Sequence, residues 1–177
     1  MKIKNKAILA MLLAVTMVSP TYAETAGEYI DDATIGSKTK TDLISNKNVS
    51  AVSINVEVYK GIVQLSGFVD SKTEEAAALA TARKVKGAKK VLDALVVFSG
   101  SRSMGEAVDD ATISVKLKTE LTKVEGLGRA IAINTEVRQG QVLLAGFVDS
   151  AKIKISAEDA ARGISGVKEV HNLIAVK

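Results

Sequence analysis

The sequence has 177 residues and a formal net charge of +4, from 24 basic and 20 acidic side chains. Three of the lysines and none of the acids lie in residues 1–23, so the rest of the chain has 21 basic and 20 acidic side chains. This near-neutral balance lacks the basic footprint of a nucleic-acid-binding protein, and we expect no nucleic-acid partner. The absence of cysteine excludes disulfides, thiolate catalysis and a lipid-bearing thiol.

The first 23 residues have the pattern of a secretory signal peptide. Three lysines precede an apolar run from Ala7 to Val18, and small residues follow as far as Ala23. The run is about half of the ~20 residues that span a bilayer, which favours a cleaved signal over a retained anchor. We therefore expect cleavage after Ala23, an exported product and no transmembrane segment in the mature protein.

The remaining chain contains the same sequence blocks twice. Three blocks recur in the same order, 78 or 79 residues further on: 31–35 at 109–113, 67–71 at 146–150, and 87–91 at 166–170. A period of this length indicates duplication of a whole small domain. We expect one domain over 28–98, a second over 109–177, and a small, polar, turn-prone linker over 99–108.

The first helix of each copy is predicted from apolar residues at four-residue spacing. These residues are Ile35, Thr39 and Leu43 in the first copy, and Ile113, Leu117 and Leu121 in the second. The acidic pairs Asp31-Asp32 and Asp109-Asp110 precede the stripes, where carboxylates stabilise the positive end of a helix. We interpret both pairs as helix caps rather than as catalytic dyads.

Two strands joined by a tight turn follow each first helix. Alternation predicts that the first strand points these residues inward: Val52, Ile54, Val56 and Val58 in the first copy, with Ile131, Ile133 and Val137 in the second. Gly61 and Gly140 mark the turns, and the second strands run to Val69 and Val148.

The second helix and the closing strand complete each copy. Ser71 and Glu74 form a capping box, and Ser150 or Asp149 has the corresponding place in the second copy. Closing strands are predicted over 91–97 and 170–176. The fold class is therefore α+β, with two tandem αββαβ domains, each a mixed three-stranded sheet with two helices on one face.

The glycine and strand pattern resembles the BON domain family. The matching segments are Gly61–Val69 and Gly87–Val91 in the first copy, and Gly140–Gly146 and Gly166–Val170 in the second. The family's asparagine in the last strand is Asn172, but the first copy has Asp93. The resemblance implies a periplasmic protein of osmotic or envelope stress that binds phospholipid surfaces or acts as a chaperone-like factor. The alternative is a non-enzymatic scaffolding module that docks an envelope protein.

The residue types for catalysis are scarce. His171 is the only histidine, and Leu92 stands in its place in the first copy, so we interpret it as an ordinary strand residue. One histidine without any thiol makes no transition-metal cluster, although an all-carboxylate site stays open. We expect no enzyme activity, no metal and no cofactor.

One cluster of cations is the candidate binding site: Arg83, Lys84, Lys86, Lys89 and Lys90. Only Arg162 and Lys168 persist in the second copy. A helix C-terminus favours cations, but five within eight residues exceed that need. Near an anionic leaflet each of these cations would contribute ~1 kcal/mol to the free energy of membrane binding. We predict contact with anionic phospholipid or another polyanion, with a solvated helix end as the alternative.

The sheet face without helices is predicted to be apolar. It carries Ile62, Ser66, Phe68, Leu92, Ala94 and Val96 in the first copy, and Leu143, Ala145, Phe147, Leu173 and Ala175 in the second. Two interpretations stay open: the copies pack sheet against sheet, or these faces are exposed docking surfaces for lipid or unfolded chains.

Overall fold

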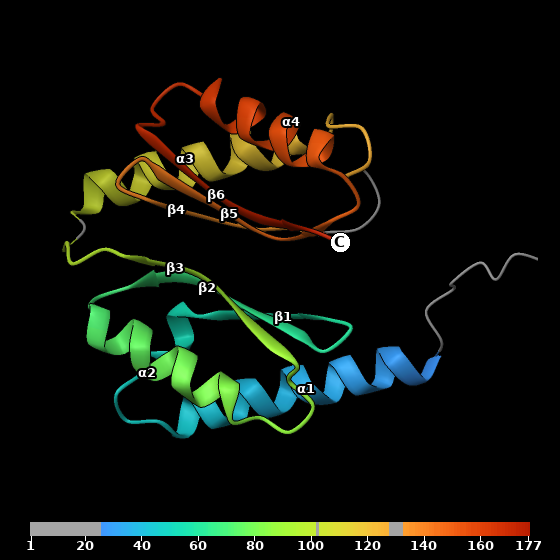
Figure 1. The fold of residues 1–177 in the computed structure, drawn as a ribbon. Helices are drawn as coiled ribbons and strands as arrows, with labels where there is room; N and C mark the ends of the chain where they lie inside the picture. Colours follow the sequence, from blue (N-terminus) through green and yellow to red (C-terminus); the bar gives the residue numbers. More distant parts are fainter. Residues whose placement is uncertain (1–25, 102, 128–132) are drawn as a thin grey trace, which may run out of the picture.

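The computed structural model describes residues 26–101, 103–127 and 133–177, and the predicted signal peptide lies outside them. Two copies of one domain follow each other along the chain (Figure 1). The first consists of α1 (Ala26–Ser45), the short 3-10 helix η1 (Ala51–Ser53), β1 (Asn55–Tyr59), β2 (Ile62–Val69), α2 (Lys72–Arg83) and β3 (Lys90–Val97). The second consists of α3 (Met104–Leu121), β4 (Ile133–Arg138), β5 (Gln141–Val148), α4 (Ala151–Arg162) and β6 (Glu169–Val176). The predicted αββαβ order is confirmed.

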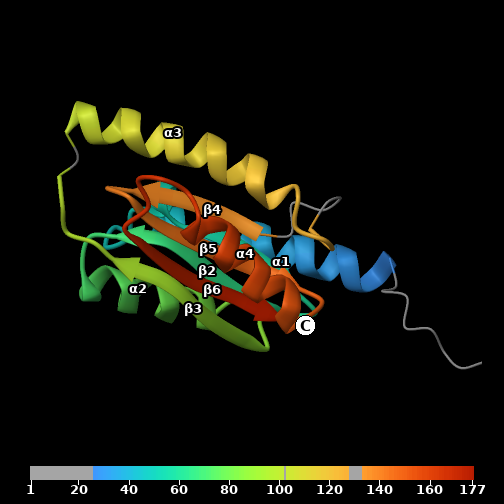
Figure 2. The ribbon, with the colours of Figure 1, turned by 90° about the horizontal axis from the view of Figure 1, so that it is seen from above.

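Each sheet has three strands and is mixed, as predicted. β1 pairs with β2 antiparallel, and β2 pairs with β3 parallel, with Ile62 opposite Lys90. The order β4-β5-β6 repeats this arrangement. A parallel partner requires a crossover, which α2 and α4 supply. Both helices of a copy therefore cover one face of its sheet (Figures 1 and 2). In the described part of the chain, no helix is both long and apolar enough to cross a bilayer.

Each copy has its own hydrophobic core between helices and sheet. The predicted helix stripes are buried in both copies, and the Thr39 hydroxyl donates to the Ile35 carbonyl at 2.7 Å. The prediction for Val52 is wrong, because η1 interrupts the alternation and leaves this side chain 96% exposed. Ile131 lies outside the described residues.

The interpretation of the acidic pairs as helix caps is wrong. Helix α1 begins at Ala26 and α3 at Met104, both upstream of the pairs. Ser103 caps α3 in a capping box with Glu106, so the end of the predicted linker, from residue 104 onward, is helical. In α3, the cap signal of Ser103 and Glu106, which begins six residues upstream of Asp109, determines where the helix starts, and the acidic pair lies inside the helix.

One aspartate of each pair anchors a hairpin turn instead. The Asp32 carboxylate accepts hydrogen bonds from the backbone N–H groups of Lys60 and Gly61 at 2.6 and 2.8 Å. Asp110 accepts from Gln139 and Gly140, both at 2.9 Å. All four turn residues have positive φ, which is typical of a type I′ hairpin turn. The carboxylate thus offsets the strain of a non-glycine residue at the first turn position.

The second helices begin as the sequence predicts, with one difference. The Ser71 hydroxyl accepts from the Glu74 N–H, and Ser150 accepts from Ile153. The Glu74 carboxylate does not close a capping box on Ser71. It accepts instead from the N–H groups of Asp70 and Ser50, at 2.9 and 2.7 Å, and so ties α2 to the loop before η1.

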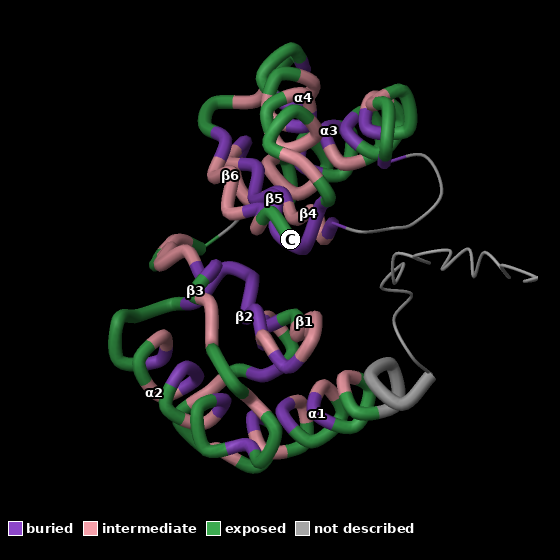
Figure 3. The backbone as a smooth tube through the Cα atoms, turned by 45° about the vertical axis from the view of Figure 1, so that its right-hand side comes forward, coloured by how far each residue is buried: buried purple, intermediate pink, exposed green. Residues whose placement is uncertain are grey.

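The helix-free faces of the two sheets pack against each other (Figures 1 and 3). The side chains of this contact that are buried are Gln64, Ser66, Phe68 and Ala94 from the first copy, with Leu143, Ala145 and Phe147 from the second. The Tyr59 and Phe147 rings lie 5.6 Å apart, centroid to centroid. Of the two open interpretations, sheet-on-sheet packing is therefore the one observed, and these faces are not exposed.

Candidate anion-binding site

The five predicted cations lie together at one end of the first copy. Arg83 ends α2, Lys84 is its C-cap, and Lys90 begins β3, with Lys86 and Lys89 in the loop between them. All five residues are exposed. In the described residues, none of their charged groups is paired with a carboxylate. Their positive charge is therefore available to an external anion.

A pocket of about 370 Å³ opens beside this loop. Three elements line it: α1 with Asp31, Asp32, Thr34 and Ile35, the β1–β2 turn with Lys60 and Gly61, and the α2–β3 loop with Lys86, Gly87 and Lys89. Lys60 was not predicted as part of the site. The parallel pairing of Ile62 with Lys90 places the turn beside the loop, and only this register identifies Lys60 as part of the site.

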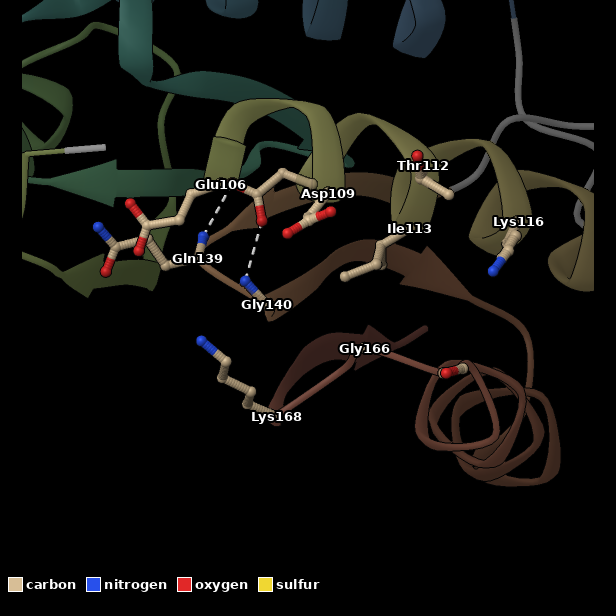
Figure 4. A pocket seen from close by; sticks show the side chains of 11 residues that line it. Glu106, Asp109, Thr112, Ile113, Lys116, Gln139, Gly140, Gly166 and Lys168 are labelled. Carbon is tan, nitrogen blue, oxygen red and sulfur yellow. Dashed lines mark hydrogen bonds between the residues drawn. The ribbon is translucent and has the colours of Figure 1, made fainter. Parts of the chain in front are cut away.

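The second copy has an equivalent pocket of about 390 Å³ (Figure 4). Its walls come from α3, the β4–β5 turn and the α4–β6 loop, including Glu106, Asp109, Gln139 and Lys168. Hydrogen bonds from Ser103 lower the pKa of Glu106, and the nearby charge of Lys168 contributes in the same direction. The charge of Lys168 is thus partly balanced within its own copy.

His171 takes part in the contact between the sheets. Its ring lies edge-on to Phe68 at 6.3 Å, and its Nε2 is 2.9 Å from the Gln141 side-chain oxygen. Among the described residues, no three acidic or histidine side chains are grouped to hold a metal ion. These contacts give His171 a packing role, and the absence of enzyme activity stays a prediction.

Asn172 connects a strand to a helix. Its Nδ2 donates to the Lys154 carbonyl and to the Glu158 carboxylate, at 3.0 and 2.9 Å. In the first copy, Asp93 accepts from the Leu95 N–H at 3.0 Å, as Asn172 does from the Ile174 N–H at 3.4 Å, but a carboxylate has no N–H to donate to the helix. The difference between the copies at this position is therefore one of helix-to-strand bonding, and Asn172 lies apart from the pocket.

Two αββαβ units with these turns define a tandem repeat of one small α+β domain, and the chain belongs to the BON domain family. The family model matches residues 31–98 and 109–177. A curated relative, the Osmotically-inducible protein Y of Escherichia coli (strain K12), is 33% identical over 153 residues, which cover 85% of this chain and 75% of the relative.

Two further similarities are more limited. The Outer membrane lipoprotein DolP of Haemophilus influenzae is 31% identical over 80 residues, or 45% of this chain and 42% of that protein. Among solved structures, the C-terminal domain of CdsD, a structural protein of the Type III secretion system of Chlamydia trachomatis, is 15% identical. The match covers 82% of this chain and 67% of that domain with a TM-score of 0.32.

Proposed function

We propose that this BON protein is exported to the periplasm and acts in osmotic or envelope stress by binding anionic phospholipid surfaces. The predicted signal peptide supports export. The similarity to an osmotically inducible protein and to an outer membrane lipoprotein supports a role at the envelope. The observation that carries the proposal is the cluster of five cations between Arg83 and Lys90, which have no carboxylate partner in the part of the chain that the structure describes.

The physical basis is electrostatic. Each lysine or arginine near an anionic leaflet contributes ~1 kcal/mol, so a cluster of five gives reversible, salt-sensitive binding. A chaperone-like role through the apolar sheet faces is less well supported, because Phe68 and Phe147 are buried between the copies. That role would require the copies to separate.

Vesicle flotation tests the proposal. We expect the protein to float with phosphatidylglycerol-containing vesicles and not with pure phosphatidylcholine, and to be released by salt. The variant Lys84→Gln/Lys86→Gln/Lys90→Gln should lose flotation. A control with the same charge change, Lys118→Gln/Lys123→Gln/Lys152→Gln in the second copy, should retain it. Equal loss in both variants would reject the site.

One observation favours the second candidate function, docking of an envelope protein. Met104, Val108 and Val115 are exposed by 89%, 66% and 67%, and their spacing places them on one side of α3. Figure 2 shows α3 along one margin of the molecule. If a protein partner docks here, Val108→Asp/Val115→Asp should abolish its co-purification and leave vesicle flotation unchanged. Co-purification that survives the change would exclude this surface.

A further inference from the structure

The pocket of the first copy has a fixed frame. The Lys89 N–H donates to the Gly61 carbonyl at 2.8 Å, and a Cβ added to Gly61 would lie 3.0 Å from the Lys89 Cδ. The Lys89 stem therefore rests directly on the turn. A Cβ at Gly87 would lie 3.0 Å from the Ile35 side chain, so the loop also packs closely on α1. Lys86 and Lys89 flank this packed glycine at the pocket.

One of the two aspartates that line the pocket, Asp32, is already engaged within the fold. Both oxygens of the Asp32 carboxylate accept hydrogen bonds from backbone N–H groups of the turn. Lys86 and Lys89 have no carboxylate partner among the described residues. Lys60 also lines the pocket, and its ammonium lies 5.4 Å from the centroid of the Tyr59 ring.

The second copy shows which of these features the frame requires. Gly140, Gly166 and Lys168 repeat the packing, with the Lys168 N–H 2.8 Å from the Gly140 carbonyl. The positions of Lys60 and Lys86, however, hold Gln139 and Ser165. The second pocket is thus lined by two lysines, Lys116 and Lys168, and by three acidic residues, Glu106, Asp109 and Asp110. Since the same frame folds without Lys60 and Lys86, folding does not explain their presence in the first copy.

We propose that the pocket of the first copy binds one phosphate group, held by Lys60, Lys86 and Lys89, and that the second copy lacks this site. Lysine ammonium groups act as compact point charges for phosphate oxygens. The phosphate could belong to a phospholipid headgroup, and in that case the inference rests on the proposed function. The other source is a free phosphate ester in solution.

Amide chemical-shift titration of the full chain with glycerol 3-phosphate tests the site directly. We expect saturable shifts at the amides of Gly61 and Gly87, and none at Gly140 and Gly166. Shifts that do not saturate, or that are equal in both copies, would overturn the inference.

Exchanging the residues that differ between the copies supplies matched variants. Lys60→Gln/Lys86→Ser gives the first copy the residues of the second, and should weaken glycerol 3-phosphate binding by about tenfold or more, or 1.4 kcal/mol per factor of ten. The reverse change, Gln139→Lys/Ser165→Lys, should create saturable shifts at Gly140 and Gly166. Unchanged affinity in the first variant would refute the assignment.

Vesicles distinguish the two sources. If phosphatidylglycerol vesicles compete with glycerol 3-phosphate for the pocket, the ligand is a headgroup. Saturable binding without such competition assigns the pocket to a free phosphate ester. Flotation without any glycerol 3-phosphate binding would overturn the pocket and leave the proposed surface binding intact, so the two proposals fail separately.

Discussion

Gln64 of the first copy accepts a hydrogen bond from the backbone N–H of Gly146 in the second, at 2.5 Å. Its Nε2 also donates to the Leu173 carbonyl at 2.9 Å, and the residue is 2% exposed. The equivalent position in the second copy is Leu143. One polar side chain in an otherwise apolar contact therefore bonds to a specific backbone site of the opposing sheet, and this favours one orientation of the two sheets.

Replacing Gln64 with the residue of the other copy tests this contact. Gln64→Leu keeps the volume but leaves two backbone groups between the sheets without their partner, so we expect a loss of about 1–3 kcal/mol in the free energy of unfolding. Urea denaturation measures this loss. Gln141→Leu, at the edge of the opposing sheet face, is the control and should cost less. A variant as stable as the parent would show that the contact does not depend on Gln64.

A half-buried glutamate at the contact, Glu57, makes the stability of the folded protein depend on pH. Burial raises the pKa of Glu57 above its ordinary 4.5, and the hydrogen bond from Asn134 across the contact opposes this only in part. The folded state therefore holds this proton more tightly than the unfolded state. The stability contributed by protonated Glu57 is complete below pH 4.5 and is lost as the pH rises through the folded-state pKa.

Glu57→Gln should remove this dependence. The amide keeps an acceptor for Asn134 and has no charge to desolvate, so we expect greater stability than the parent at pH 7 and a smaller difference at acid pH. Urea denaturation of both proteins across this range measures the effect. A parent that gains stability from Glu57 as the pH rises would contradict the sign.

The aspartate anchors of the hairpin turns should matter equally in both copies. Asp32→Ala leaves two turn N–H groups without their acceptor and keeps Lys60 at positive φ, so we expect a loss of about 1–3 kcal/mol. Asp110→Ala is the matched change in the second copy. Amide hydrogen exchange should show faster opening of β1–β2 in the first variant and of β4–β5 in the second. Uniform protection in both variants would argue against the anchor.

Two glycines should respond in opposite directions to alanine. A Cβ at Gly67, where φ is +141°, would lie 2.0 Å from the Ser53 carbonyl oxygen, so Gly67→Ala should be severely destabilising. Among the described residues, no atom beyond the neighbouring helix backbone comes within 4 Å of a Cβ added to Gly105, in the first turn of α3. Gly105→Ala should therefore stabilise by up to about 1 kcal/mol. Thermal unfolding measures both changes. Similar effects of the two substitutions would contradict the backbone geometry at Gly67.

Periodicity and duplication predicted much of this fold. Leu43 and Leu117 lie on predicted helix stripes that pack into the cores. Because each pattern occurs in both copies, the positions of the glycine turns were predicted correctly. The prediction for Val52 failed because the short helix η1 interrupts what looks like a strand. The prediction for Asp32 failed because its carboxylate bonds to a turn 28 residues further on, a contact that the sequence pattern does not show.

The candidate site was predicted in part for a related reason. Arg83 to Lys90 are close in sequence, so a charge count finds them, whereas Lys60 joins them only through the parallel pairing of β2 with β3. Gln64 looks like any polar residue in a strand until the second sheet is placed over it.

An exchange of loops between the copies tests the central claim most directly. Residues 83–90 are replaced with residues 162–169 in one protein, and the reverse exchange is made in another. Flotation with phosphatidylglycerol vesicles is then measured at low and high salt. If the protein binds the surface through the first copy, replacing residues 83–90 should abolish flotation. The reverse exchange gives a protein with the basic loop in both copies, which should float more strongly. Full flotation of the protein that lacks the original loop would contradict the account.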